Sequence, residues 1–173
     1  MNSIETIPFF GGVAGAITVF VIAIIFSSFV EYWIHRLAHE GIVLKEVHWS
    51  HHQINRTGGW LWDYLYVIRI GLWPFAWIGF PFGVRVGFIF LLGEIVYLGL
   101  AVYSHELQHR YPNQVFWMKC PVHYLHHRYR KGSDNFGLLT DFWDRVFRTS
   151  SDQFWKPSGE KISLRKLLGI KWY

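Results

Sequence analysis

The sequence has few of the residues on which several common classes of protein depend. It contains one cysteine, Cys120, so it forms neither an internal disulfide framework nor a zinc module built on cysteine thiolates. It has no glycine-rich phosphate-binding loop and no low-complexity tract. The first residues lack the basic region of a secretory signal, so we expect the apolar run that follows them to be retained.

Positive charge is missing from the first part of the chain. No Lys or Arg precedes Arg36, whereas twelve of the 17 lie after Ser104. Lys and Arg collect on the cytoplasmic flanks of membrane spans, so this asymmetry indicates a membrane topology. The net charge of +5 therefore does not point to nucleic acid, and we expect no nucleic-acid partner.

Hydrophobic side chains are abundant for a chain of 173 residues, at 51%, and 20% of all residues are aromatic. A chain this short has too little interior to bury so many, so part of them should contact lipid. A helix of about 20 apolar residues crosses a membrane. Pro81 and Gly83 interrupt the second apolar block, which predicts a helical hairpin whose first arm is kinked or re-entrant. The expected parts of this single domain are spans at about 7–30, 65–82 and 84–103, a histidine-rich cap formed by 31–59 and 104–149, and a basic tail at 150–173.

All ten histidines fall in four clusters, and the spacing H-x3-H followed by H-x2-H-H occurs twice. Helical residues three or four positions apart share a face, so the imidazoles of each cluster can converge on one ion. Neutral imidazole suits zinc, copper, iron and nickel, which leaves the metal open. Ten imidazoles exceed the needs of one ion, so the pattern predicts a site for two. The expected ligands are His35, His39, His48, His51, His52, His105, His109, His123, His126 and His127.

The order of spans and clusters predicts on which side of the membrane the site lies. One span before the first pair of clusters and a hairpin before the second pair place all four on the side of the basic tail, the cytoplasmic side. The predicted fold is an all-α integral membrane helical bundle with a cytosolic helical cap that carries a dinuclear metal site. The expected location is a bacterial inner membrane, or the endoplasmic reticulum in a eukaryote.

Acidic and amide side chains near the clusters are candidates to orient the ligand histidines. A metal-bound histidine usually donates its other ring N–H to a carboxylate or a carbonyl. Glu40, Glu46 and Glu106 lie in the same segments, although ordinary solvated charge is the better explanation of the first two. The principal candidates are Glu31, Glu94, Asn135, Asp141 and Asp144.

Glu94 has a second interpretation. It lies in an expected span, as does Arg69, at a similar distance from the Pro81–Gly83 turn. Ionisable groups within spans usually face the protein interior in pairs, so the two can form a buried ion pair. Alternatively, Arg69 extends its charged end to the membrane surface.

The four histidine motifs, in this order, resemble those of the fatty acid hydroxylase / sterol desaturase superfamily of membrane di-iron oxygenases. Asn135-Phe-Gly137 and the segment from Phe142 to Thr149 resemble further motifs of that family, so the resemblance covers about Val30 to Thr149. It implies two iron ions held mainly by histidines, with O2 as co-substrate, and hydroxylation or desaturation of a fatty acyl or sterol-like lipid. It also implies a separate electron donor such as cytochrome b5 or a ferredoxin. The matching histidine motifs are His35-Arg-Leu-Ala-His39, His48-Trp-Ser-His51-His52, His105-Glu-Leu-Gln-His109 and His123-Tyr-Leu-His126-His127.

Some features depart from the family pattern and leave alternatives. Arg148 stands where the family usually has a glycine. Zinc can replace iron in an expressed sample. Within the enzyme class the alternative is a carotenoid β-ring hydroxylase, although its first and third motifs are one residue wider than those here. Outside that class the alternatives are a membrane metal-binding or transport protein and a haem-binding subunit, for which ten clustered histidines are too many.

Overall fold

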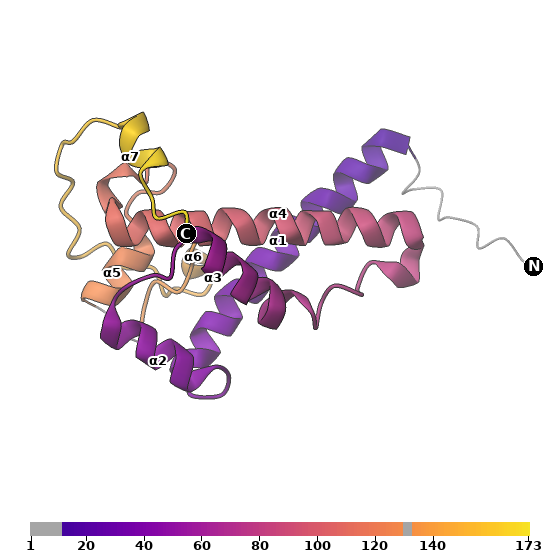
Figure 1. The fold of residues 1–173 in the computed structure, drawn as a ribbon, viewed down its shortest axis with the longest axis horizontal. Helices are drawn as coiled ribbons and strands as arrows, with labels where there is room; N and C mark the ends of the chain where they lie inside the picture. The colour runs from indigo at the N-terminus through magenta and orange to yellow at the C-terminus, as the bar shows by residue number, and fades with distance from the viewer. Residues whose placement is uncertain (1–11, 130–132) are drawn as a thin grey trace, which may run out of the picture. The chain divides into compact units, whose positions relative to one another are not determined.

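The computed structural model describes residues 12–129 and 133–173. Every regular element in these two ranges is helical, which confirms the predicted all-α class (Figure 1). Residues 7–11 of the first expected span lie outside the described ranges. The elements in chain order are α1 (Gly12–His39), α2 (Lys45–Ile54), α3 (Trp60–Val67), the π-helix η2 (Ile68–Leu72), the 3-10 helix η3 (Phe80–Phe82), α4 (Val84–Arg110), the 3-10 helix η4 (Pro112–Gln114), α5 (Val122–Arg128), α6 (Phe142–Val146) and α7 (Leu164–Leu168).

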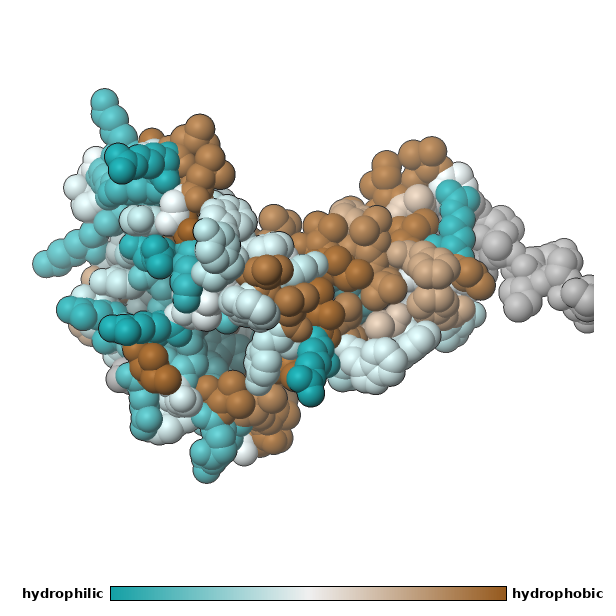
Figure 2. Space-filling model, viewed as in Figure 1, coloured by the Kyte–Doolittle hydropathy of each residue, from teal (hydrophilic) through white to brown (hydrophobic). Residues whose placement is uncertain are grey.

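Two helices in the described part of the chain, α1 and α4, are long and apolar enough to cross a membrane. They have 28 and 27 residues, and a rise of about 1.5 Å per residue makes each roughly 40 Å long. Many of the apolar side chains of α1 are exposed, among them Val13, Ile17 and Ile25, as expected of a helix that faces lipid. Hydrophobic residues cover much of the visible surface over the two helices in Figure 2.

The chain divides into two compact units, and the first comprises residues 12–28 and 64–99 of the described chain. In it, Val19 and Ala23 of α1 pack with Phe90 of α4. A Cβ added to Gly93 would lie 2.6 Å from the Cβ of Ala23 and 3.0 Å from the carbonyl oxygen of Phe20. The absence of a side chain at Gly93 is therefore what lets these helices approach so closely.

The expected span at 65–82 is not one continuous helix. It comprises the end of α3, the π-helix η2, a series of turns and the 3-10 helix η3, so the expected interruption of this arm is present. Gly83, at φ +120°, ends the arm before α4 begins, where the hairpin turn was expected. That this arm crosses the membrane stays a prediction.

The hypothesis of a buried ion pair between Arg69 and Glu94 is wrong. Glu94 is buried, and its Oε2 atom has no hydrogen-bond partner among the described residues. Arg69 is exposed, and no ion pair between the two side chains occurs in the described structure. The exposed position of Arg69 fits the alternative, in which its charged end reaches water.

The second unit comprises residues 29–63 and 100–173 and contains all ten histidines. Its core includes Leu107, Val122, Leu125 and Ile170, all almost completely buried. Pro112 follows the end of α4 and Pro121 precedes α5, because proline cannot continue a helix and suits a helix start.

The basic tail is tied to this unit. The backbone N–H of Trp60 donates to the Lys171 carbonyl at 2.7 Å, and that of Leu61 donates to the Trp172 carbonyl at 2.9 Å. The Tyr103 hydroxyl donates to the Leu167 carbonyl at 2.9 Å. The end of the chain therefore packs against the beginning of α3 and the last turns of α4.

Candidate metal centre

Four helical segments bring the histidines together. His35 and His39 lie at the end of α1, three histidines lie on α2, two lie near the end of α4 and three lie on α5. In each segment the spacing of three or four residues places the rings on one face. All ten expected ligands therefore surround one interior region of the second unit.

The ligand nitrogens form two groups. Within each group the atoms that could hold an ion lie within 4.8 Å of one another. His127 adjoins the two groups. Its ring stacks on that of His52 with 4.1 Å between the ring centroids, and its centroid lies 4.6 Å from those of His51 and His109. We call the sets the first group (His35, His39, His48, His52 and His126) and the second group (His51, His105, His109 and His123).

The nitrogen distances in the first group fit a coordination sphere. The Nε2 atom of His39 lies 2.6 Å from that of His48, 2.7 Å from that of His126 and 3.1 Å from that of His52. One ring nitrogen makes one hydrogen bond, as donor or as acceptor, so these three contacts cannot all be hydrogen bonds. Nitrogens bound at 2.0–2.1 Å to a tetrahedral ion are about 3.4 Å apart. The cluster is therefore close to the size that a bound metal requires.

Burial keeps these histidines neutral. Burial, followed by repulsion from neighbouring histidines, lowers the pKa of His48 to about 3. Burial also lowers the pKa of His126 to about 3 and holds the pKa of His123 well below its usual value. Neutral imidazole is the form that binds metal, so the clusters are in the ligating form at pH 7.

Several buried ring nitrogens have no hydrogen-bond partner among the described residues. They include both nitrogens of His123, both nitrogens of His127 and the Nε2 atoms of His35 and His109. A buried polar atom without a partner costs free energy, and native proteins contain few of them. A metal ion in each group would give one nitrogen of a ligand ring its partner, so the donor set fits the expected centre.

Backbone carbonyls fix the orientation of three rings. The Nδ1 atom of His35 donates to the Phe136 carbonyl at 2.5 Å, and that of His126 donates to the Asp134 carbonyl at 2.6 Å. The Nδ1 atom of His51 donates to the Arg56 carbonyl at 3.2 Å. A proton on Nδ1 leaves the Nε2 lone pair free for a metal.

Two of the expected orienting residues act on the backbone rather than on a histidine. The Asp144 carboxylate accepts the N–H groups of Phe136 and Gly137 at 2.8 and 2.9 Å. The Asn135 side chain binds both the N–H and the carbonyl of Ser151, each at 2.8 Å. The sequence suggested that these side chains orient a ligand histidine directly. In the described structure they instead hold the turn whose carbonyls accept from His35 and His126.

The other acidic candidates have different surroundings. The Asp141 carboxylate is mostly buried and pairs with the exposed Arg145 side chain at 2.6 Å, within α6 and its N-cap. Glu31 accepts the N–H of Leu138 at 3.3 Å. Glu94 belongs to the first unit, and its role beside a ligand histidine stays a prediction.

Glu40 and Glu106 differ in burial. Glu40 lies at the surface, 3.5 Å from Arg36. Glu106 is fully buried and accepts from Arg110 Nε and from the Lys171 N–H, both at 3.1 Å. Glu106 therefore links the end of α4 to the tail.

Sequence reasoning missed Gln108. This fully buried side chain donates to the Leu138 carbonyl at 2.7 Å and accepts the backbone N–H of His123 at 2.8 Å. It lies inside the third histidine motif, directly before His109. Its place in that motif was the one signal in the sequence that could have identified it. Gln108 positions the beginning of α5, which carries three of the histidines.

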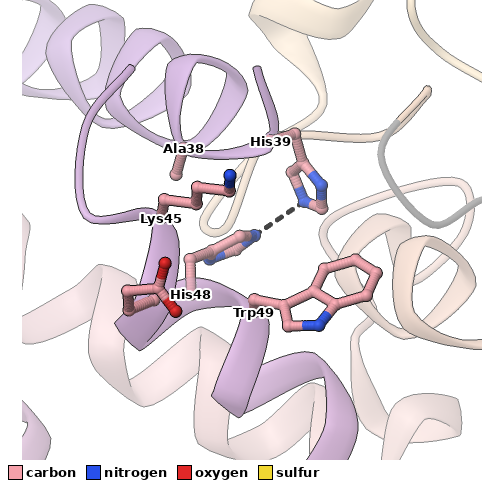
Figure 3. Close-up of a pocket in the computed structure, with 6 residues that line it drawn as sticks. Ala38, His39, Lys45, His48 and Trp49 are labelled. Carbon is pink, nitrogen blue, oxygen red and sulfur yellow. Dashed lines mark hydrogen bonds between the residues drawn. The ribbon is translucent and has the colours of Figure 1, made fainter. Parts of the chain in front are cut away.

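A pocket of about 250 Å³ opens beside the first group (Figure 3). His39 and His48 line it with Nε2 atoms that face each other, and Lys45 and Trp49 extend from α2 at its edge. The pocket therefore lies against two of the candidate ligand residues. Ala38 and Glu46 complete the lining.

The family is decided by a match over most of the chain. Residues 20–149 match the family model described as "Fatty acid hydroxylase". The chain belongs to the fatty acid hydroxylase family. The match includes all four histidine motifs and the turn near Asn135, so the resemblance inferred from them is confirmed. Family membership and the two apolar helices together indicate a membrane protein.

Curated relatives act on lipids, according to their names. The chain is 27% identical to ornithine lipid hydroxylase OlsE of Rhizobium tropici over 137 residues, which cover 75% of this chain and 40% of the relative. It is 28% identical to a putative methylsterol monooxygenase of Dictyostelium discoideum over 158 residues, 84% of this chain and 55% of that protein. It is 29% identical to a Δ7-sterol 5(6)-desaturase of Aspergillus fumigatus over 130 residues, 71% of this chain and 36% of that protein.

The matched regions are only part of these relatives. The chain spans about half of their length or less. No solved structure matches it significantly.

Proposed function

We propose that this protein is a membrane lipid oxygenase. It hydroxylates or desaturates a fatty acyl or sterol-like lipid with O2, two iron ions and electrons from a separate donor such as cytochrome b5 or a ferredoxin. The observation that carries the proposal is the convergence of nine histidines into two groups, with His127 beside both, within a chain of this family. The lipid hydroxylases and desaturases among the relatives support a lipid substrate.

The chain's own residues prepare the site for metal. The first and second groups supply nine ring nitrogens, and His127 adds a tenth beside both groups. Burial keeps the imidazoles neutral, and the bonds from Nδ1 to backbone carbonyls direct Nε2 towards the ions. When bound, two iron ions supply O2 activation and the oxidation of an unactivated C–H bond.

The helices connect the site to the membrane. His35 and His39 lie in the last turns of α1, and His105 and His109 lie near the end of α4, so both apolar helices continue into ligand-bearing turns. A substrate held in lipid would therefore have its chain close to the metal. The concentration of Lys and Arg after Ser104 supports a cytoplasmic position for the site.

Metal analysis and lipid profiling test this function together. We expect purified protein to contain about two metal ions per chain, with iron supporting activity and zinc inactive. Cells that express the wild-type protein should accumulate a hydroxylated or unsaturated lipid, and cells that express His126→Ala should not. Asp152→Asn is a matched control, because the Asp152 side chain forms an exposed ion pair with Lys119.

The outcomes separate the alternatives. An unchanged profile of lipids and carotenoids in cells with metal-loaded wild-type protein and a functional electron donor would contradict the oxygenase. A changed content of cellular metal with an unchanged lipid profile would instead support metal binding or transport. Loss of product in Asp152→Asn as well would show that the effect of His126→Ala is not specific.

A further inference from the structure

The two histidine groups differ in how firmly their rings are held. In the first group, His35 and His126 donate to carbonyls of the same short segment, at 2.5 and 2.6 Å. In the second group, the one such bond recorded within the described residues is that of His51, at 3.2 Å to an exposed carbonyl. The two buried ring nitrogens of His123 have no hydrogen-bond partner among the described residues. The first group is therefore ordered before a metal arrives, and the second group is ordered less.

The segment that holds the first group is itself fixed. We call residues 134–137 the anchor turn. The Asp144 carboxylate binds two successive N–H groups of this turn and also accepts the Thr149 hydroxyl at 2.7 Å. The N–H of Asn135 donates to the Thr149 carbonyl at 2.8 Å, and its side chain binds Ser151 twice. Asp144 and Asn135 are both fully buried, so water does not compete for these bonds.

The backbone of the anchor turn allows few alternatives. Asn135 has φ +62°, a left-handed conformation that asparagine tolerates better than most residues. A Cβ added to Gly137 would lie 2.1 Å from the Thr140 carbonyl oxygen and 3.0 Å from the Asp144 carboxylate. The carbonyls that receive His35 and His126 are thus held in place by the surrounding structure.

We propose that the anchor turn makes the first group the tighter of the two metal sites, and that Asp144 is a positioning residue for that group alone. The proposal rests on the metal centre of the proposed function. A ligand set ordered in advance loses less conformational freedom when metal binds, and outer partners of ligand histidines typically contribute 10–100-fold to metal affinity. The first ion therefore binds to the first group, and the second site fills only at higher metal concentration.

Titration of the metal-free, full-length protein with Co²⁺ tests the proposal. We expect the visible absorption of bound Co²⁺ to show two successive steps in the wild type. His109→Ala, which alters the second group, should remove the weaker step only. Asp144→Asn keeps the size of the side chain but places an amide group against an N–H of the turn, and it should weaken the tighter step about 10–100-fold. The weaker step should not change.

Asp141→Asn is the matched control for Asp144→Asn. Both carboxylates belong to the same short segment, but that of Asp141 pairs with Arg145 and does not bind the anchor turn. We expect both steps to be unchanged in Asp141→Asn. A second readout is direct: the Nδ1 protons of His35 and His126 should give hydrogen-bonded NMR signals in metal-free wild type, and Asp144→Asn should shift or remove them.

The failure of this inference differs from the failure of the proposed function. Fewer than two ions bound by folded wild type would overturn the metal centre itself. Two ions bound with equal affinity, or a folded Asp144→Asn that weakens both steps or neither, would overturn the inference and leave the centre. If Asp144→Asn does not fold, Asn135→Gly takes its place, since glycine keeps the positive φ and removes the bonds to Ser151. Unchanged binding in folded Asn135→Gly would also overturn the inference.

Discussion

The Nε2 atoms of His39 and His126 lie 2.7 Å apart, although the two residues are 87 positions apart in the sequence. With Nδ1 of His126 bonded to the Asp134 carbonyl, its Nε2 atom carries a lone pair that faces the ring of His39. This close approach joins the end of α1 to α5, and a shared metal ion is the partner that suits both nitrogens.

Removal of one of these nitrogens should release an ion. We expect His39→Ala to lower the metal content from about two ions per chain to about one and to abolish formation of the lipid product. Glu40→Gln, at the exposed neighbouring position, should keep both ions. Metal analysis of the purified variants measures the difference, and two tightly bound ions in His39→Ala would contradict the assignment.

The metal-free protein should lose stability in acid. In the folded state the pKa values of His48 and His126 are about 3, whereas in the unfolded chain they are near 6.5. The unfolded chain therefore binds more protons below pH 6.5, and the free energy of unfolding falls as the pH falls. The expected loss is about 1.4 kcal/mol per pH unit for each histidine that stays neutral in the folded state.

Thermal unfolding of metal-free protein in detergent at pH 7.5 and pH 5.0 checks this. A clearly lower melting temperature at pH 5.0 is expected, and His48→Asn should reduce the difference. The same melting temperature at both pH values would show that these histidines titrate normally in the folded protein.

Gln108 should matter for stability as well as for metal. Gln108→Ala leaves the buried His123 N–H without its partner, whereas the Leu138 carbonyl still accepts the Ser104 hydroxyl at 2.7 Å. Each unsatisfied buried group costs about 1–3 kcal/mol, so we expect a marked fall in melting temperature and weaker binding at the second group, which contains His123. Gln53→Ala, on the exposed face of α2, is the control and should have little effect. Equal stability of the two variants would argue against a structural role for Gln108.

Arg148→Gly should stabilise the protein. Arg148 has φ +59°, the left-handed region that costs a residue with a side chain about 1–2 kcal/mol and costs glycine little. Part of this gain is lost because glycine has more freedom in the unfolded chain, so we expect a net gain of about 0.5–1 kcal/mol. Arg145→Gly, inside α6, should destabilise the protein instead. Chemical denaturation of both variants measures the opposite signs.

The sequence predicted the parts of this structure that depend on local periodicity. The helical segments around His35/His39, His48–His52 and His123–His127 follow from spacings of three and four residues. Family resemblance placed a glycine at position 148, and the positive φ of Arg148 now gives the physical reason.

The sequence could not predict how the histidines are divided or what holds them. The four clusters do not correspond to the two groups, because His51 and His52 are neighbours that serve different groups. The carbonyls that receive His35 and His126 leave no trace in residue type, since every residue has one. The ion pair expected between Arg69 and Glu94 is absent from the described structure, in which Arg69 lies in the π-helix η2 and is exposed.

The neighbouring positions of His51 and His52 have a consequence for the two candidate metal sites. Successive residues of a helix point about 100° apart, so one peptide unit of α2 reaches towards both coordination spheres. Two ions bound in the two groups would therefore share α2 as a common support through adjacent residues. Any bending of α2 would disturb both spheres at once, so the pair should respond to strain as a single unit.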